Sequence, residues 1–406
     1  MQGKVKTGAD RFPEMAPALI KGRKFGLLTN PTGINRDFQS TIQVCASLDE
    51  AELGALFACE HGIRGERQAG VRFEDEIDPE LGIPVYSLYG KHKKPTADML
   101  SGLQAMVFDI QDLGVRFYTY LSTLIYTLEA CAEAGVRVVV LDRPNPLGGL
   151  EWEGGLLDES LLSMVGAWRM PARTGMTIGE FALLAADQMK TPCELYVVKM
   201  EGWEREMEYP DTGLPWLPPS PNMPTMDTVR IYAGHCLFEG TNLSEGRGTT
   251  KPFEQVGAPW LKAEETCREL NALKLPGVRF HPVTFTPTFS KHAGQLCNGV
   301  MTFVTDPSVY KSAVTGLHLL SCIQRLHPGE FEWLAPFKEG QSTFIDLLSG
   351  SDRIRLTLHE PGALEAIIAS WERDGKEWAG IRSKYLLYGP EAAAAASAAE
   401  ARGNGV

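Results

Sequence analysis

The sequence lacks the long apolar run that a membrane-spanning helix needs. None of its 406 residues lies in a stretch that approaches about 18 consecutive apolar residues. Positive charge is also scarce, because the formal net charge is −12 and the one short basic run, KHKK at 91–94, is interpreted as a solvated loop. We therefore expect no membrane span and no nucleic-acid partner.

Signals for cofactors and for metals are absent as well. No GxGxxG follows the first expected strand, and the chain has no GxxxxGK[ST] loop, no GxSxG elbow and no HExxH. None of the eight cysteines forms a CxxC pair, so zinc spacing is missing. We expect neither a cofactor nor a metal, although a metal built from His61, Asp109 and Asp112 is an alternative.

The ends of the chain and its thiols bear on the compartment. The N-terminus, MQGKVKTGADRF, has no apolar signal core. Cysteines in apolar segments, such as Cys45 and Cys131, are interpreted as buried free thiols in a reducing compartment. We expect a cytoplasmic protein, and export with a trimmed leader is the alternative.

What the first half does contain is an alternation of strands and helices. Strands are expected near 25–28, 53–58, 83–88, 106–109, 136–141 and 195–198, with helices at 38–48, after 95, at 118–134 and after 177. Gly135 is placed to end the third helix, and Thr177 and Glu180 have capping-box spacing. This alternation predicts an α/β fold: a Rossmann-like, mainly parallel sheet with helices on both faces.

From Glu201 the regular alternation of expected strands and helices stops, and the sequence becomes rich in proline and tryptophan. The stretch GLPWLPPSPNMP cannot form a regular helix or a central strand. A helix near 263–273, extended pieces at 278–289 and 299–304, and two or three final helices predict a smaller α+β C-terminal domain. The expected organisation is an N-terminal extension (1–20), a Rossmann-like domain (21–200), an α+β domain (201–390) and an Ala-rich tail (391–406).

Four polar clusters follow expected strands: TNPTG at 29–33, EHGIRG at 60–65, DIQDLGVR at 109–116 and DRPNP at 142–146. Loops at the carboxyl ends of parallel strands share one edge and line a common crevice. The clusters therefore predict one crevice for a polar organic substrate.

Glu60 is the first candidate for chemistry, because it emerges directly from an apolar strand. Desolvation there favours the neutral carboxylic acid, which can donate a proton. The alternatives are acceptance of backbone N–H bonds or an ion pair with Arg64.

Other polar residues are candidates for substrate contacts, each with a structural alternative such as helix capping, ion pairing, core packing or a rigid turn. A Gly/Thr-rich loop at 238–254 adds charged residues from the second half. The candidates are Asn30, His61, Arg64, Asp109, Gln111, Asp112, Arg116, Tyr118, Tyr120, Asn145, Glu239, Asn242, Glu245 and Arg247.

Taken together, the motifs resemble those of the NamZ-type exo-β-N-acetylmuramidase family of bacterial peptidoglycan hydrolases. The resemblance runs from about residue 24 to about residue 388. It is carried in order by GLLTNPTGIN, EHGIRGERQAG, GIPVYSLYGKHKKPT, FDIQDLGVRFYTY, LDRPNPLGG, GMTIGE, LPWLPPSPNMPT, LFEGTNLSEGRGTTKPFE and FTPTFSKHAGQLCNGV.

The resemblance implies a glycoside hydrolase of hexosaminidase type that releases N-acetylmuramic acid from the non-reducing end of peptidoglycan fragments. It implies a cleft between the two domains and places the family's catalytic glutamate on Glu60. Candidate catalytic partners are His61, Asp109, Asp112, Glu239 and Glu245. Candidate substrate-binding residues are Asn30, Arg64, Gln111, Arg116, Tyr118, Tyr120, Asn145, Asn242 and Arg247.

The chemistry of this substrate agrees with the residues. Its lactyl carboxylate calls for an arginine, for which Arg64, Arg116 and Arg247 are candidates. Two positions depart from the expected family pattern: Cys59 stands where we expect proline, and His235 is unexpected in YAGHCLFEG.

Two further functions stay open. One is a non-catalytic muropeptide or amino-sugar binding protein. The other is a metal-dependent hydrolase, such as a deacetylase. The expected partners are small molecules, namely peptidoglycan glycan ends and muropeptides, and the sequence indicates no oligomeric state.

Overall fold

The computed structural model describes residues 5–60, 62–65 and 74–390, and within them the N-terminal half forms a seven-stranded sheet. The strand order is β3-β4-β2-β1-β5-β6-β7, and all neighbours are parallel except β3 and β4. The strands are β1 (Lys24–Thr29), β2 (Glu52–Ala58), β3 (Glu76–Ile77), β4 (Pro84–Ser87), β5 (Ala105–Asp109), β6 (Arg137–Leu141) and β7 (Leu195–Val198).

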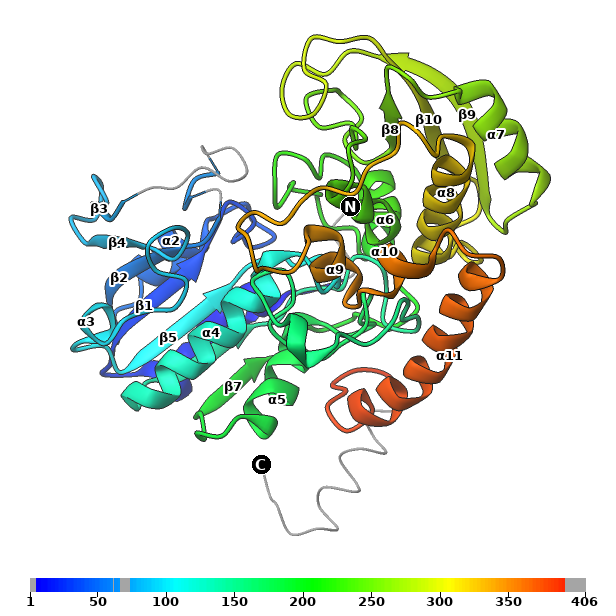
Figure 1. The fold of residues 1–406 in the computed structure, drawn as a ribbon. Coiled ribbons are helices and arrows are strands. Elements are labelled where there is room, and N and C mark those ends of the chain that lie inside the picture. The colour runs from blue at the N-terminus through cyan, green and yellow to red at the C-terminus, as the bar shows by residue number, and fades with distance from the viewer. Residues whose placement is uncertain (1–4, 61, 66–73, 391–406) are drawn as a thin grey trace.

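Helices cover both faces of this sheet (Figure 1). Successive side chains of a strand point to opposite faces, and in β5 Met106 and Phe108 join one hydrophobic core while Ala105 and Val107 join another. The first core receives α4 and α5, and the second receives α1 and α2. The expected α/β architecture is confirmed. The helices are α1 (Gly8–Ile20), α2 (Thr41–Ala46), α3 (Ala97–Leu100), α4 (Thr119–Ala134) and α5 (Ile178–Gln188).

The expected start of α5 and the expected end of α4 are both confirmed, whereas α1 was not expected. Thr177 and Glu180 form the capping box of α5, and Gly135 ends α4 with φ 66°. No helix was expected before residue 24, yet α1 lies there with Pro13 and Pro17 inside it. Prolines usually mark helix boundaries, which explains why this pattern does not read as a helix.

The C-terminal half is built around a smaller antiparallel sheet of order β8-β10-β9, which confirms the expected α+β texture. Up to residue 390, where the description ends, four helices follow β10 where two or three were expected, and α6 was not expected. The elements are α6 (Met226–His235), β8 (Gln255–Ala258), α7 (Ala263–Ala272), β9 (Val278–Phe285), β10 (Cys297–Val304), α8 (Ser312–Leu326), α9 (Phe344–Ser349), α10 (Arg353–Thr357) and α11 (Ala363–Arg382).

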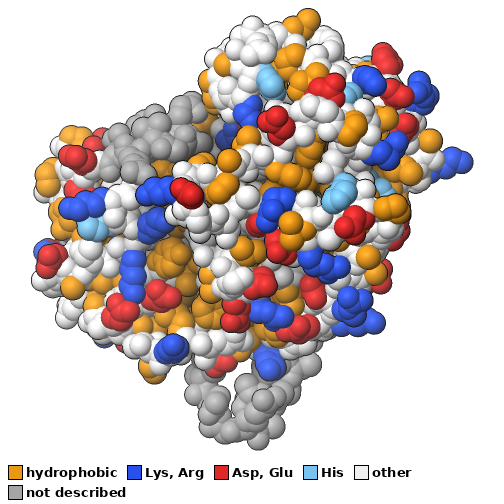
Figure 2. All heavy atoms as spheres, viewed as in Figure 1, with side chains coloured by type: hydrophobic (Ala, Val, Ile, Leu, Met, Phe, Trp, Pro, Cys, Tyr) orange, Lys and Arg blue, Asp and Glu red, His pale blue; other side chains and the backbone are white. Residues whose placement is uncertain are grey.

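The two halves share one hydrophobic core, which runs from β5 and α4 through α6 to α8 and α9. All eight cysteines are free, and all but Cys193 are buried. No helix in the described ranges is both long and apolar enough to cross a bilayer. On the face shown in Figure 2, acidic and basic side chains are interspersed rather than gathered into one basic stripe. The tail at 391–406 and His61 lie outside the described residues.

Candidate active site

A cavity of about 850 Å³ draws its lining from both halves of the chain. The N-terminal half supplies Glu60, just after β2, and the start of α4. The C-terminal half supplies side chains from α6, α9 and the loops around them. The lining residues are Glu60, Tyr89, Phe117, Tyr118, Thr119, Tyr120, Met164, Val165, Ser220, Met223, Tyr232, Cys236, Glu239, Arg247, Phe289, Ser290, Phe344 and Leu348.

Glu60 is held from two sides. Thr119 at the start of α4 donates its hydroxyl to Glu60 Oε2 at 3.1 Å, and the Cys59 thiol contacts the Glu60 carbonyl oxygen at 3.6 Å. Burial raises the pKa of the Cys59 thiol, so it stays protonated as a donor. Cys59 thus braces the turn where a proline was expected. Arg64, the alternative partner of Glu60, forms an ion pair with Asp78 at 3.1 Å.

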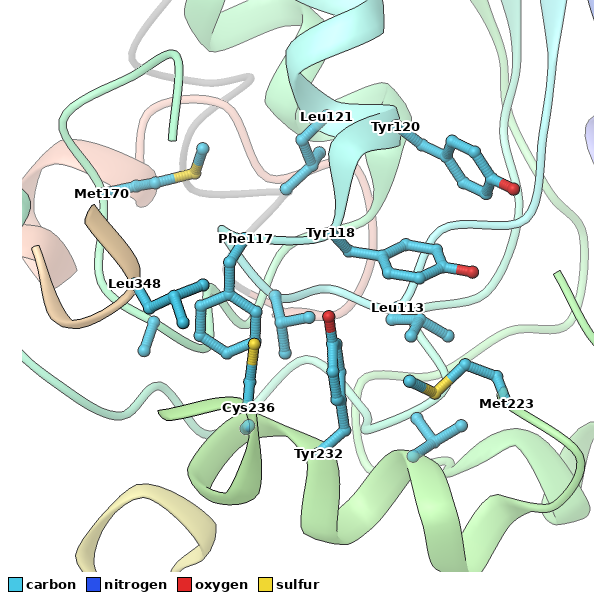
Figure 3. Close-up of a cluster of buried hydrophobic side chains, with 14 of the residues drawn as sticks. Leu113, Phe117, Tyr118, Tyr120, Leu121, Met170, Met223, Tyr232, Cys236 and Leu348 are labelled. Atoms are coloured by element: carbon cyan, nitrogen blue, oxygen red, sulfur yellow. The ribbon is translucent and has the colours of Figure 1, made fainter. Parts of the chain in front are cut away.

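Four aromatic side chains, Phe117, Tyr118, Tyr120 and Tyr232, line the cavity and form what we call its floor. Figure 3 shows these four side chains gathered in one cluster. Tyr118 lies 4.8 Å from Tyr120 and 6.1 Å from Tyr232 between ring centroids, and both contacts are edge-to-face. Tyr120 donates to the Pro219 carbonyl at 2.5 Å and accepts from the Asn30 amide at 3.0 Å. Within the described chain the Tyr118 hydroxyl is buried without a hydrogen bond.

The opposite wall carries a network of two acids and two bases. Arg247 pairs through Nη2 with Glu239 Oε2 at 3.1 Å and through Nε with Glu245 Oε1 at 3.2 Å. Lys291 Nζ pairs with Glu245 Oε2 at 2.9 Å. The Arg247 guanidinium also lies 4.9 Å from the centroid of the Phe253 ring, a cation–π contact. Glu239 and Arg247 line the cavity, and Glu245 lies behind them.

Burial sets the protonation of this wall. Desolvation raises the pKa of Glu239, and repulsion by Glu245 adds to it, against the attraction of Arg247. Burial lowers the pKa of Arg247, but the carboxylates of Glu239 and Glu245 outweigh this and raise it. The pKa of the Glu239 carboxyl is therefore shifted upward, in the direction of neutral pH, although the carboxyl lies beside the permanent positive charge of Arg247.

His235, which was unexpected in the sequence, contacts this network indirectly, through Phe253. Its Nδ1–H donates to the Phe253 carbonyl at 2.6 Å, and Nε2 lies 3.3 Å from the Thr302 hydroxyl. Burial lowers its pKa to about 4, so the ring is neutral. The bond fixes Phe253, whose backbone has φ 62° and whose ring contacts Arg247.

The polar clusters at 29–33, 109–112 and 142–146 meet one another rather than the cavity. Asp109 is fully buried and takes a two-point ion pair from Arg143, at 2.6 Å and 2.9 Å, together with the Thr41 hydroxyl. Gln111 donates to the Pro144 carbonyl at 2.8 Å, and Asn145 to the Met176 carbonyl at 2.8 Å. These side chains hold the turns, so the expectation of one crevice shared by all four clusters is corrected.

Buried polar groups elsewhere also serve the scaffold. Arg116 donates to the carbonyls of Gly155, Met170 and Leu348 at 2.8–3.0 Å, and burial lowers its pKa to about 10. Asp112 accepts from the Gly114 backbone N–H at 2.6 Å, and burial raises its pKa to about 7. Asn242 fixes the loop around 330–332 through Nδ2 and Oδ1.

Of the candidate residues, five line the cavity: Glu60, Tyr118, Tyr120, Glu239 and Arg247. The others in the described ranges lie outside its lining: Asn30, Arg64, Asp109, Gln111, Asp112, Arg116, Asn145, Asn242 and Glu245. Apolar and aromatic side chains make up much of the lining, a larger share than the polar clusters suggested.

Sequence reasoning missed several lining residues, including Thr119, Tyr232, Cys236 and Phe289. Thr119 stands inside the noted FYTY run, so its position could have been found. The other three residues belong to the C-terminal half, and the sequence does not show how that half packs against the N-terminal half. Among the described side chains, no group of three or more His, Cys, Asp or Glu is arranged to hold a metal ion.

Comparison with known proteins covers nearly the whole chain. Residues 25–227 match the N-terminal family model of exo-beta-N-acetylmuramidase NamZ, and residues 230–388 match its C-terminal model. Peptidoglycan beta-N-acetylmuramidase NamZ of Bacillus subtilis (strain 168) is 45% identical over 385 residues, which is 95% of this chain and 92% of that protein.

Two crystal structures of DUF1343 family proteins from Bacteroides fragilis NCTC 9343 share the fold. One has a TM-score of 0.88 and 35% identity, covering 96% of this chain and 100% of the other. The second has a TM-score of 0.76 and 29% identity, covering 95% of this chain and 99% of the other.

Proposed function

We infer the function from one premise, that the chain belongs to the exo-beta-N-acetylmuramidase NamZ family. We propose that it is a glycoside hydrolase that acts on peptidoglycan as a β-N-acetylmuramidase. We further propose that it acts from the non-reducing end and releases N-acetylmuramic acid. The observation that carries this is the cavity lined by Glu60 from one half and by Glu239 and Arg247 from the other.

Arg247 is the proposed receptor for the lactyl carboxylate of N-acetylmuramic acid. Among the three arginines considered, it alone lines the cavity, whereas Arg116 donates to backbone carbonyls and Arg64 pairs with Asp78. Its Nε and Nη2 are engaged by carboxylates, and Nη1 has no partner within the described chain. A guanidinium fixed in this way offers a directed donor to a substrate anion.

Glu60 is the proposed general acid. Its carboxylic acid donates a proton to the glycosidic oxygen as the bond from that oxygen to C1 breaks, which releases the leaving sugar as an alcohol. The Thr119 hydroxyl, 3.1 Å from Oε2, holds the carboxyl in the cavity. Positioning of this kind is what proton transfer requires.

Glu239 is the proposed second carboxyl, because it is the candidate partner that lines the same cavity as Glu60. A base is most effective when its pKa approaches the working pH, and burial raises the pKa of Glu239 in that direction. It takes a proton from the water that attacks C1, or it stabilises the substrate's acetamide if that group attacks first. Water attack inverts the anomeric centre, and acetamide attack retains it.

The remaining candidates have graded roles in this proposal. Tyr118 and Tyr120 present ring surface to the sugar, since they form the floor of the cavity. Asp109, Gln111 and Asn145 hold the turns that follow the strands of the sheet. The proposed substrates are glycan ends and muropeptides of peptidoglycan.

The test is incubation with a disaccharide that has N-acetylmuramic acid at its non-reducing end, followed by mass spectrometry and anomeric NMR. We expect free N-acetylmuramic acid and N-acetylglucosamine, with no requirement for added metal. Binding without any product would favour the binding-protein alternative. Loss of a lactyl or acetyl group with an intact glycosidic bond would overturn the glycosidase assignment.

A further inference from the structure

Phe289 is an unusual member of the cavity lining, because it is exposed. Its side chain is 45% exposed, whereas the aromatic floor residues Phe117, Tyr120 and Tyr232 are at most 5% exposed. Phe289 therefore stands at the mouth of the cavity and not at its closed end. An aromatic ring that both lines the cavity and is partly exposed is accessible to a ligand that extends from the cavity into solvent.

The backbone after Phe289 adopts a conformation that side chains disfavour. Ser290 has φ 70° and His292 has φ 57°, both in the left-handed region. Residues other than glycine rarely adopt this region, and such conformations persist where the surrounding structure enforces them.

The enforcement comes from the loop that carries the candidate catalytic wall. The Thr288 N–H and hydroxyl both donate to the Gly248 carbonyl at 2.9 Å. Lys291 Nζ donates to the carbonyls of Phe238 and Thr241, at 2.7 Å and 2.9 Å.

Gly248 lets the two loops approach this closely. It has φ 80°, and a Cβ added there would meet the Phe289 backbone N and O at 2.7 Å. His292 Nε2 adds a contact to the Asn242 carbonyl at 2.7 Å. These contacts therefore fix the position of Phe289 relative to the loop that carries Glu239 and Arg247.

The geometry points to a second sugar subsite at this mouth. We propose that the Phe289 ring is the platform on which the leaving-group sugar packs, namely the N-acetylhexosamine ring linked to C1 of N-acetylmuramic acid. This rests on the proposed function, in which the terminal ring occupies the closed end and the next ring extends toward solvent. The apolar C–H face of a pyranose suits an aromatic ring, and a cavity of about 850 Å³ lies within the range of about 300–1,000 Å³ that holds ligands of this size.

The experiment measures affinity for one ring and for two rings by calorimetry. The ligands are N-acetylmuramic acid and a sulfur-linked disaccharide of N-acetylmuramic acid and N-acetylglucosamine, which resists hydrolysis. The proteins are the native chain, Phe289→Ala, Phe289→Trp and Phe303→Ala. Phe303 is a matched control on β10, 47% exposed and outside the cavity lining.

In the native chain we expect the disaccharide to bind about fivefold to tenfold more tightly than the monosaccharide, the gain typical of one aromatic contact. Phe289→Ala should abolish this difference while affinity for the monosaccharide stays unchanged. Phe289→Trp and Phe303→Ala should keep it.

Three results would overturn the platform. They are a native protein that binds both ligands equally, a Phe289→Ala variant that keeps the preference, or one that weakens both ligands by the same factor. Each of these leaves the proposed function standing. A native protein that binds neither ligand would instead overturn the proposed function, and the platform with it.

Discussion

Exchange of Glu239 for glutamine should separate chemistry from stability in the charged wall of the cavity. Glu239 lines the cavity, whereas Glu245, which pairs with the same guanidinium, lies behind it. The Glu239→Gln and Glu245→Gln variants remove the same charge from the same network. They differ in which carboxyl can reach a substrate, so each serves as the control for the other.

The expected magnitudes follow from the contacts. In Glu239→Gln the Arg247 guanidinium keeps Glu245 at 3.2 Å, so the free energy of unfolding should change by only about 1 kcal/mol. Loss of a general base should lower kcat by about 10²- to 10⁴-fold, or about 3–5 kcal/mol in the activation barrier.

Glu245→Gln should show the opposite pattern. Its side chain is nearly fully buried between Arg247 and Lys291, so removal of its charge should cost about 3 kcal/mol of stability. Because it does not line the cavity, kcat should fall less than about tenfold.

The assay combines steady-state kinetics on the disaccharide, a pH–rate profile and urea unfolding. A base works only when deprotonated, so native activity should fall as the pH drops through the pKa of Glu239, which burial places above its usual range. This acidic limb should vanish in Glu239→Gln. Equal kcat losses in the two variants, or a larger loss in Glu245→Gln, would refute the assignment of Glu239 as the reacting carboxyl.

Three further predictions concern buried groups around the cavity. Burial raises the pKa of Asp112 from 3.8 to about 7, so the folded state binds the extra proton between these two values and stability should fall as pH rises through this window. Asp112→Asn should flatten this dependence in urea unfolding between about pH 4 and about pH 7. His235→Phe should lose the hydrogen bond to the Phe253 carbonyl, and we expect a higher KM and a lower kcat. His235→Asn keeps a donor, so its KM and kcat should lie close to those of the native protein. Equal kinetics in the two variants would contradict this role of His235. Arg116→Met should lower the free energy of unfolding by about 3 kcal/mol, because three carbonyls, including that of Leu348, lose their donor; a loss under about 1 kcal/mol would contradict the role given to it.

Local sequence signals were sufficient for most of the sheet and its helices, with β3 and α1 as the exceptions. Each strand of the sheet except β3 lies within one or two residues of its expected position. These strands could be located because apolar runs, and the polar residues that end them, are local features of the sequence. The capping box at Thr177 and the C′ glycine at 135 act within a single turn of helix. Glu60 could be placed in a cavity for the same reason, since it directly follows a buried strand.

The assignment of polar residues to the cavity needed information that is not local. Asp109 ends β5 and Arg143 lies two residues beyond the end of the neighbouring strand β6, so the two side chains form an ion pair with each other and not with a substrate. A single sequence shows both residues as candidates, because an ion pair depends on which strands are adjacent and how they are registered.

The second wall shows the same limit. Glu239 and Arg247 were found as members of a charged loop, but the lining residues Tyr232 and Cys236 were not. Their place depends on how α6 packs on Phe117 and Tyr118 through aromatic contacts, and this docking leaves no periodic signal. His235 was noticed as unusual, and only the contact to Phe253 gives it a reason.

The most direct test of the account is the dependence of Glu60→Gln on the leaving group. We would compare kcat/KM for the disaccharide and for a nitrophenyl glycoside of N-acetylmuramic acid, with circular dichroism as the check on folding. A general acid matters most when the leaving oxygen needs a proton, so we expect a loss of about 10²- to 10⁴-fold on the disaccharide and a much smaller loss on the nitrophenyl glycoside. Near-native rates on the disaccharide, or equal losses on both substrates, would contradict the role of Glu60 as proton donor.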